Sequence, residues 1–203
     1  YTASNGDIFE GEFKEGRRDG VGCYIYSNGD QYDGMWKDGK KHGQGVMNFV
    51  TGARYEGHYK EDRKHGKGIY SHADGSYYSG EYKNGKPHGR GKYAYVDTSY
   101  YEGEFQGGMK HGQGVVRLAD GTMYRAQFLR NKRITAKTMV RLPMSLEDLP
   151  DQAKIMEGHR RMMSTSHANT IRATLYRSGM LPLPPGVTPA MLDADQASSW
   201  GGS

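Results

Sequence analysis

The chain has 203 residues, of which only 35% are hydrophobic and 30 are glycine, and its formal charge is +5. This composition argues against a large apolar core, and sixteen tyrosines argue against disorder throughout the chain. The single cysteine, Cys23, excludes an intramolecular disulfide, and no apolar run reaches the roughly 18 residues that a membrane-spanning helix requires. We therefore expect a reducing, cytoplasmic setting. Because the chain begins with Tyr1 rather than methionine, we also expect that it is trimmed at its N-terminus.

An aromatic-x-Gly-x-aromatic element recurs every 23 residues, from Phe9 to Tyr32 and from Tyr32 to Tyr55. Its five full copies are Phe9 to Phe13, Tyr32 to Trp36, Tyr55 to Tyr59, Tyr78 to Tyr82 and Tyr101 to Phe105. A degenerate sixth copy, Tyr124 to Phe128, has Ala126 in place of the glycine. A Gly-x-Gly pair recurs with the same period, from Gly20/Gly22 to Gly112/Gly114. This gapless periodicity predicts a repeat protein.

Asn-Gly and Asp-Gly pairs supply the positive φ angles that tight hairpin turns require. Clear pairs are Asn28-Gly29, Asp38-Gly39, Asp74-Gly75, Asn84-Gly85 and Asp120-Gly121, with weaker turn signals at Thr51-Gly52, Asp62-Arg63, Asp97-Thr98 and Gly107-Gly108. Between them lie short alternating stretches such as Tyr32 to Trp36, so each repeat is predicted to be two antiparallel strands. Tyr32, Gly34 and Trp36 then share one face, and the glycine leaves bare backbone on which a ring of the neighbouring repeat can lie.

The segment from Tyr32 to Gly45 resembles a MORN repeat, the membrane occupation and recognition nexus motif. The resemblance implies a mainly β fold, a single-layer antiparallel rod of β-hairpin repeats over residues 1–133, with an aromatic-lined groove. It also implies a range of roles. Members of the family include radial-spoke-head proteins of cilia, membrane tethers, cytoskeletal organisers and repeat arrays fused to enzymes.

Two surfaces are the candidate sites for partners. The first is a predicted partner-binding groove lined by Tyr32, Trp36, Tyr55, Tyr59, Tyr78, Tyr82, Tyr101 and Phe105. A single-layer sheet has no second layer to cover such rings, so we expect some of them to stay available to a partner. The second is a predicted basic edge of Lys40, Lys41, Arg63, Lys64, Lys86 and Lys110. In the simplest interpretation these are turn residues whose charges are solvated by water. In the functional interpretation they attract an acidic surface such as anionic lipid.

Catalytic and metal sites are not expected. The periodic histidines, His42, His65, His88 and His111, recur two strands apart, about 9.6 Å, which is too far for imidazoles that share one zinc ion. We predict instead that each closes a hairpin turn before the following glycine. Cys23 occupies a position that holds Val46 or Ile69 in other repeats, so it is expected to be a small buried hydrophobe. We predict no enzyme activity and no cofactor. Nucleic acid is not an expected partner, because acidic residues alternate along the same strands.

Residues 134–203 are predicted to form a basic linker, two short helices and a Pro-rich tail. We expect the chain to be a non-enzymatic scaffold or adaptor in a cytoskeletal assembly, most often a ciliary or flagellar axoneme, since family members are frequent there. The alternatives are a membrane-associated tether that binds anionic phospholipids weakly, and a regulatory module of a larger enzyme. End-to-end association of copies is a further expectation, because an open sheet has free edges at its two ends.

Overall fold

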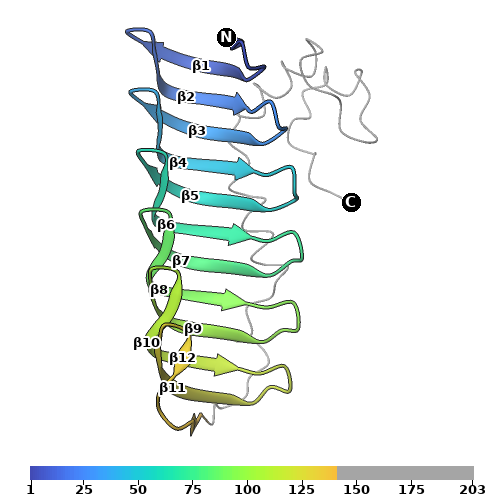
Figure 1. The fold of residues 1–203 in the computed structure, drawn as a ribbon, viewed down its shortest axis with the longest axis vertical. Helices are drawn as coiled ribbons and strands as arrows, with labels where there is room; N and C mark the ends of the chain where they lie inside the picture. The colour runs from blue at the N-terminus through green and yellow to red at the C-terminus, as the bar shows by residue number, and fades with distance from the viewer. Residues whose placement is uncertain (141–203) are drawn as a thin grey trace, which may run out of the picture. The chain divides into compact units, whose positions relative to one another are not determined.

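The computed structural model describes residues 1–140, and the predicted helices and Pro-rich tail lie outside the described residues. The described part is one 13-stranded antiparallel sheet with strand order β1 to β12, and β13 pairs with β11 (Figure 1). The strands are β1 (Ile8–Lys14), β2 (Arg17–Ile25), β3 (Gln31–Lys37), β4 (Lys40–Asn48), β5 (Arg54–Lys60), β6 (Arg63–Ser71), β7 (Tyr77–Lys83), β8 (Lys86–Ala94), β9 (Tyr100–Gln106), β10 (Met109–Arg117), β11 (Met123–Leu129), β12 (Lys132–Arg133) and β13 (Thr138–Met139). The prediction of a single-layer sheet of hairpin repeats is confirmed.

Tight two-residue turns join each odd-numbered strand to the next strand. Both central residues of each turn have positive φ, for example 48° at Asp38 and 81° at Gly39, which is the type I′ geometry that matches strand twist. One predicted turn is displaced by a residue: the turn between β5 and β6 is Glu61-Asp62, with φ of 50° and 65°, rather than Asp62-Arg63. Aspartate tolerates this left-handed conformation because its short side chain bonds locally, so the turn forms without glycine.

Each tight turn after the first is hydrogen bonded to the hairpin before it. The backbone N–H of Gly39 donates to the carbonyl oxygen of Arg18 at 2.8 Å, and the N–H of Asp62 donates to that of Lys41 at 3.0 Å. Longer five-residue loops join the even strands to the odd ones at the other end of the sheet, and they are linked as well. Asp30, for example, accepts the N–H of Val50 at 2.9 Å. The repeats are therefore held in fixed register at both ends.

A β-bulge interrupts every full hairpin at the same place. In the pair β3–β4, Gly34 lies opposite Gly45 and Trp36 lies opposite Lys41, so β4 carries the extra residues. Gly43, in the bulge, has a φ of 61°, a conformation that favours glycine. The predicted turn role of the histidines is therefore corrected: His42 lies in β4, in the extra residues of this bulge, and not in a turn.

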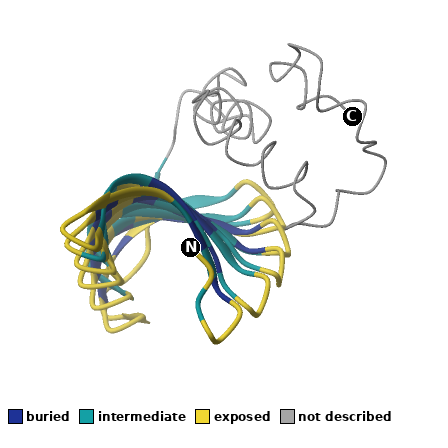
Figure 2. Cartoon of the chain, turned by 90° about the horizontal axis from the view of Figure 1, so that it is seen from above, coloured by how far each residue is buried: buried dark blue, intermediate teal, exposed yellow. Residues whose placement is uncertain are grey.

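The sheet is strongly bent, as Figure 2 shows when it is viewed along its long axis. Lys41 lies next to a tight turn and Tyr26 lies in the loop at the opposite end, yet the Lys41 ammonium is 2.9 Å from the Tyr26 hydroxyl. A flat nine-residue strand would separate its two ends by about 30 Å. The face that carries both side chains is therefore concave, and we call it the concave face.

The last described residues fold back along β11. Phe128 and Leu129 pair with β12, and Tyr124 and Arg125 pair with β13. The sequence predicted that the sheet ends at residue 133, whereas the pairing continues to Met139. This edge of the sheet is thus covered by the chain itself.

Candidate functional site

The eight rings predicted to line a groove lie on the concave face and are buried. Their exposed fractions run from 0% at Tyr32, Tyr55 and Tyr101 to 6% at Phe105. They pack edge to face in one continuous row: Tyr32 contacts Trp36 of its own strand at 5.1 Å between centroids and Tyr59 of the next repeat at 5.2 Å. The same two contacts recur through Tyr55, Tyr78 and Tyr101. These rings form the core of the bent sheet, and a partner cannot reach them directly.

Pairs of glycines make this burial possible. Gly34 and Gly45 lie opposite each other, and a Cβ atom built on Gly45 would stand 2.3 to 2.6 Å from the ring and hydroxyl of Tyr32. The ring therefore lies flat on bare backbone, and it belongs to the same repeat, not to the neighbouring one as the sequence suggested. Its hydroxyl donates a hydrogen bond of 3.0 Å to the carbonyl oxygen of Met35. Burial raises the pKa of the Tyr32 phenol, so the ring stays neutral.

The predicted basic edge divides between the two faces of the sheet. Consecutive strand residues point to opposite faces, so Lys40, Arg63 and Lys86 are exposed beside the tight turns, whereas Lys41, Lys64 and Lys110 point onto the concave face. Their matching distance from the turns predicted that all six residues form one stripe. Because side chains alternate between the two faces of a strand, sequence neighbours such as Lys40 and Lys41 fall into two sets, one exposed and one on the concave face.

The inward cations rest on the aromatic rings, and we call Arg18, Lys41, Lys64 and Lys110 the inner cations. The Lys64 ammonium is 4.0 Å from the centroid of Tyr70 and 4.7 Å from that of Tyr55, with Phe49 and Tyr82 at about 6 Å. Arg18 stands in the same way over Trp36 at 4.3 Å and Tyr24 at 4.8 Å. Each inner cation thus lies in a cage of rings from two or three successive repeats. The rings attract the cation through their negative faces.

Lys64 lies within about 6 Å of four rings, more than any other inner cation. Burial lowers the pKa of its ammonium group to about 8, because leaving water disfavours the charged form. The surrounding ring faces act in the opposite direction and favour the ammonium. Lys64 is therefore a lysine whose charge depends on this aromatic environment.

Half-buried rings from the loop ends of the strands border the cages, and we call them the aromatic rim. The rim consists of Tyr24, Tyr26, Phe49, Tyr70, His72, Tyr93 and Tyr95. Neighbouring rings lie side by side at a tilt of 51°, with centroids 4.6 Å apart for Tyr24 and Tyr26 and 4.7 Å apart for Tyr93 and Tyr95. This row was not predicted from the sequence, although the 23-residue spacing between Tyr26, Phe49, His72 and Tyr95 indicates it. The rim is the aromatic surface that a partner can touch.

The exposed cations at the tight turns face one another across the strands. Lys37 pairs with Lys40, Lys60 with Arg63, Lys83 with Lys86 and Lys14 with Arg17. We call these eight residues the basic ladder; the lysines on the odd strands were missed although they too recur every 23 residues.

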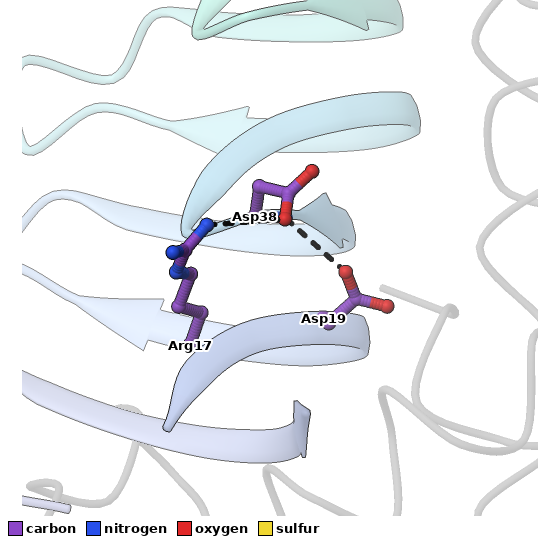
Figure 3. A network of polar contacts seen from close by, with 3 residues as sticks. All are labelled: Arg17, Asp19 and Asp38. Atoms are coloured by element: carbon purple, nitrogen blue, oxygen red, sulfur yellow. Dashed lines mark hydrogen bonds and ion pairs between the residues drawn. The ribbon is translucent and has the colours of Figure 1, made fainter. Parts of the chain in front are cut away.

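Acidic side chains lie within and next to the basic ladder. In Figure 3 the guanidinium of Arg17 lies 3.5 Å from Asp38 of the next turn, and the N–H of Asp38 donates to Asp19 at 3.2 Å. The side chains of Arg17 and Asp38 are about two-thirds exposed, so this ion pair contributes little stability. The acidic residues nevertheless reduce the net positive charge of the ladder.

Within residues 1–140, no group of three or more His, Cys, Asp or Glu side chains is arranged to hold a metal ion. Cys23 is buried on the face opposite the aromatic rings, as expected for a small hydrophobe. No helix in the described part is long and apolar enough to cross a bilayer.

Comparisons with known proteins identify the repeat. The family model described as MORN repeat matches five consecutive segments, residues 9–31, 32–54, 55–77, 78–100 and 101–123. No curated protein matches the chain. The SAS-4 (dCPAP) TCP domain of Drosophila melanogaster, solved in complex with a proline-rich motif of Ana2 (dSTIL), is 13% identical, with a TM-score of 0.40 over 63% of this chain and 68% of that chain. At that score the likeness implies nothing about what this chain binds.

Proposed function

The chain belongs to the MORN-repeat family, and from this premise we propose that it is a non-enzymatic scaffold whose aromatic rim binds partner proteins. One observation carries the proposal: a row of partly exposed rings lies along one side of a core that is already complete. Tyrosine rings at such positions supply large, rigid contact area and are enriched in the energetic centres of protein interfaces. The eight buried rings then act as the floor that fixes the rim in place.

A partner chain would lie along the rim and contact several repeats. Because the strand spacing is about 4.8 Å, equivalent rim residues recur about every 9.6 Å. An extended peptide or a helix that follows the long axis of the sheet can therefore use the same kind of contact several times. Family membership supports a cytoskeletal setting for this scaffold, and within it we propose a ciliary or flagellar axoneme.

The test has two steps. Proximity labelling from the tagged chain in ciliated cells should identify the partner and its location. The partner should then be titrated against Tyr70→Ala and Tyr93→Ala, and we expect each to lower affinity by roughly thirtyfold, about 2 kcal/mol.

The matched control is charge reversal at Lys37 and Lys40, which lie on the basic ladder and away from the concave face. Each variant must keep its unfolding temperature before its affinity is compared. Normal binding by the two folded tyrosine variants, with loss of binding in the Lys37/Lys40 reversal, would contradict the rim proposal.

A second candidate function, a membrane-associated tether, draws support from the basic ladder. Its eight exposed cations could attract an anionic lipid surface at about 1 kcal/mol each, if they were not offset. The turns also contain Glu15, Asp38, Glu61 and Asp62, so the attraction should be weak and should fall with salt. Vesicle sedimentation at low and physiological ionic strength tests this, and tight, salt-resistant binding would favour the tether over the scaffold.

A further inference from the structure

Five repeats place aromatic rings around the same inward position of the sheet, and four of them fill that position with a cation of their own. Arg18, Lys41, Lys64 and Lys110 are spaced by multiples of 23 residues, and each stands over rings of the concave face. The fourth repeat has Pro87 at this position. Pro87 pairs with Tyr82 as Lys64 pairs with Tyr59, so the backbone is in register and only the side chain differs.

The rings of the fourth cage are all present. By the repeat spacing, its walls are Tyr78, Tyr93, His72 and Phe105, which correspond to Tyr55, Tyr70, Phe49 and Tyr82 around Lys64. Tyr78 and Phe105 are in edge contact at 4.9 Å, and the centroids of His72 and Tyr93 lie 5.9 Å apart. Within residues 1–140, no lysine or arginine stands over Tyr78, Tyr93 or Phe105. The proline ring is too short to reach where a lysine places its ammonium, and Tyr93 and His72 are only half buried.

In the sixth repeat the cation over the aromatic ring comes from another segment of the chain. The repeat's equivalent of the inner cations would be Arg133, but the cation over Tyr124 is Lys137, at 4.8 Å from the centroid. Lys137 comes from the segment just before β13, which lies along the edge of the sheet. A segment that lies beside a ring of the sheet can therefore supply the cation that a repeat lacks.

The surroundings of the fourth cage favour positive charge. Asp74 lies in the loop that joins His72 to Tyr77, and its carboxylate accepts hydrogen bonds from the Ser76 hydroxyl at 2.7 Å and the Ser76 N–H at 2.9 Å. These bonds lower the pKa of Asp74, so it remains ionised at neutral pH. The same serine hydroxyl lies 3.4 Å from the Tyr93 hydroxyl, which places this charge next to the rim ring of the cage. Lys64 and Lys110 are each about one repeat away, about 9.6 Å along the sheet, where physiological salt weakens their repulsion.

We propose that the cage of Tyr78, Tyr93, His72 and Phe105 binds a lysine or arginine side chain of the partner protein. The inference deepens the proposed scaffold function, because it states the chemistry of one contact and its position in the array. The one full repeat without its own cation would then fix the register of a partner that otherwise meets four similar repeats.

The experiment uses the full chain and a small probe, so it does not depend on which partner is found. N-acetyl-arginine amide is titrated to tens of millimolar while ring resonances are followed by NMR, with N-acetyl-citrulline amide as the neutral isostere. We expect the arginine probe to shift the ring signals of Tyr93 and His72, and the citrulline probe to leave them unchanged. Equal shifts with both probes, or none with either, would overturn the proposal.

Two substitutions at one position complete the test. Pro87→Lys should fill the cage from within, abolish the probe response and raise the unfolding temperature, whereas Pro87→Ala should leave the cage open and keep the response. A response that persists in a folded Pro87→Lys variant would place the probe elsewhere and contradict the proposal. If the cage binds the probe but Tyr70→Ala and Tyr93→Ala leave the affinity for the partner unchanged, the partner uses neither the rim nor the cage. If Tyr70→Ala weakens partner binding and Pro87→Lys does not, the rim function stands and the proposal for the cage fails.

Discussion

The hydroxyl of Tyr55 donates a hydrogen bond of 3.0 Å to the carbonyl oxygen of His58, three residues further along the same strand, β5. The bond spans the point where Gly57 leaves room beneath the ring, and it recurs from Tyr32 to Met35, from Tyr78 to Glu81 and from Tyr101 to Glu104. It explains why four of the five full repeats begin with tyrosine, whereas the first, with Phe9, lacks the bond. The hydroxyl of each of these tyrosines thus ties its ring to the strand beneath it.

Tyr55→Phe should destabilise the sheet by about 1 kcal/mol, because it removes this bond and leaves the His58 carbonyl without the donor. Urea unfolding followed by circular dichroism measures the loss. Tyr1→Phe is the control, since Tyr1 is 78% exposed and should tolerate the change. An unchanged midpoint for Tyr55→Phe would show that the hydroxyl contributes nothing to stability.

Gly68→Ala should be more damaging than a change at a turn glycine. Its Cβ atom would meet the Tyr55 hydroxyl oxygen at 2.4 Å and the ring at 2.7 Å, and the ring is buried and cannot move aside. Forcing atoms into a packed core costs about 1 to 3 kcal/mol. The comparison is Gly85→Asn, where φ is 84° and nothing lies within 4 Å of the added Cβ. Asparagine already occupies the equivalent position at Asn131, so this variant should unfold near the wild-type temperature.

Stability should rise with pH above about 8 because of Lys64. Its folded pKa of about 8 lies below the unfolded value of about 10.4, so between these values the unfolded chain binds the extra proton. Above about pH 10 the trend should reverse, because burial raises the pKa of Tyr55, Tyr59 and Tyr82 above that of tyrosine in the unfolded chain. Denaturant midpoints from pH 7 to 11 measure both trends. Lys64→Met should lose the rise and keep the later fall; a rise of equal size in that variant would exclude Lys64 as its cause.

Asp62 links two repeats, because its carboxylate accepts the N–H of Lys41 at 2.9 Å. Asp62→Gly keeps the positive φ but removes this acceptor, and we expect a loss of about 1 kcal/mol in thermal or chemical unfolding. Asp62→Asn should be nearly neutral, since Asn131 makes the same bond to the N–H of Lys110 at 2.8 Å. If the glycine and asparagine variants unfold at the same temperature, the side-chain bond is not a stabilising link.

The repeat, the antiparallel pairing and most of the turns follow from the 23-residue period and the positions of Asn-Gly and Asp-Gly pairs. The sites were harder to predict. Burial of Trp36 and Tyr59 depends on the bend of the sheet, and the bend arises from bulges that a strand pattern does not reveal. To predict that Lys40 and Lys41 lie on opposite faces, the alternation of side chains along a strand must be applied from the first residue after the turn. Pro87 is unusual only by comparison with the other full repeats, in which this position supplies an inner cation.

Every strand from β1 to β10 pairs only with its neighbours in the sequence, and β11 pairs in addition with the nearby β13, so each contact is local along the chain. The repeats can therefore separate one after another without disturbing those further away. Under a stretching force applied at the two ends of the sheet, the molecule should lengthen in equal steps. Each step would release one 23-residue repeat, about 80 Å of extended chain, so that the applied tension determines how many partner contacts remain.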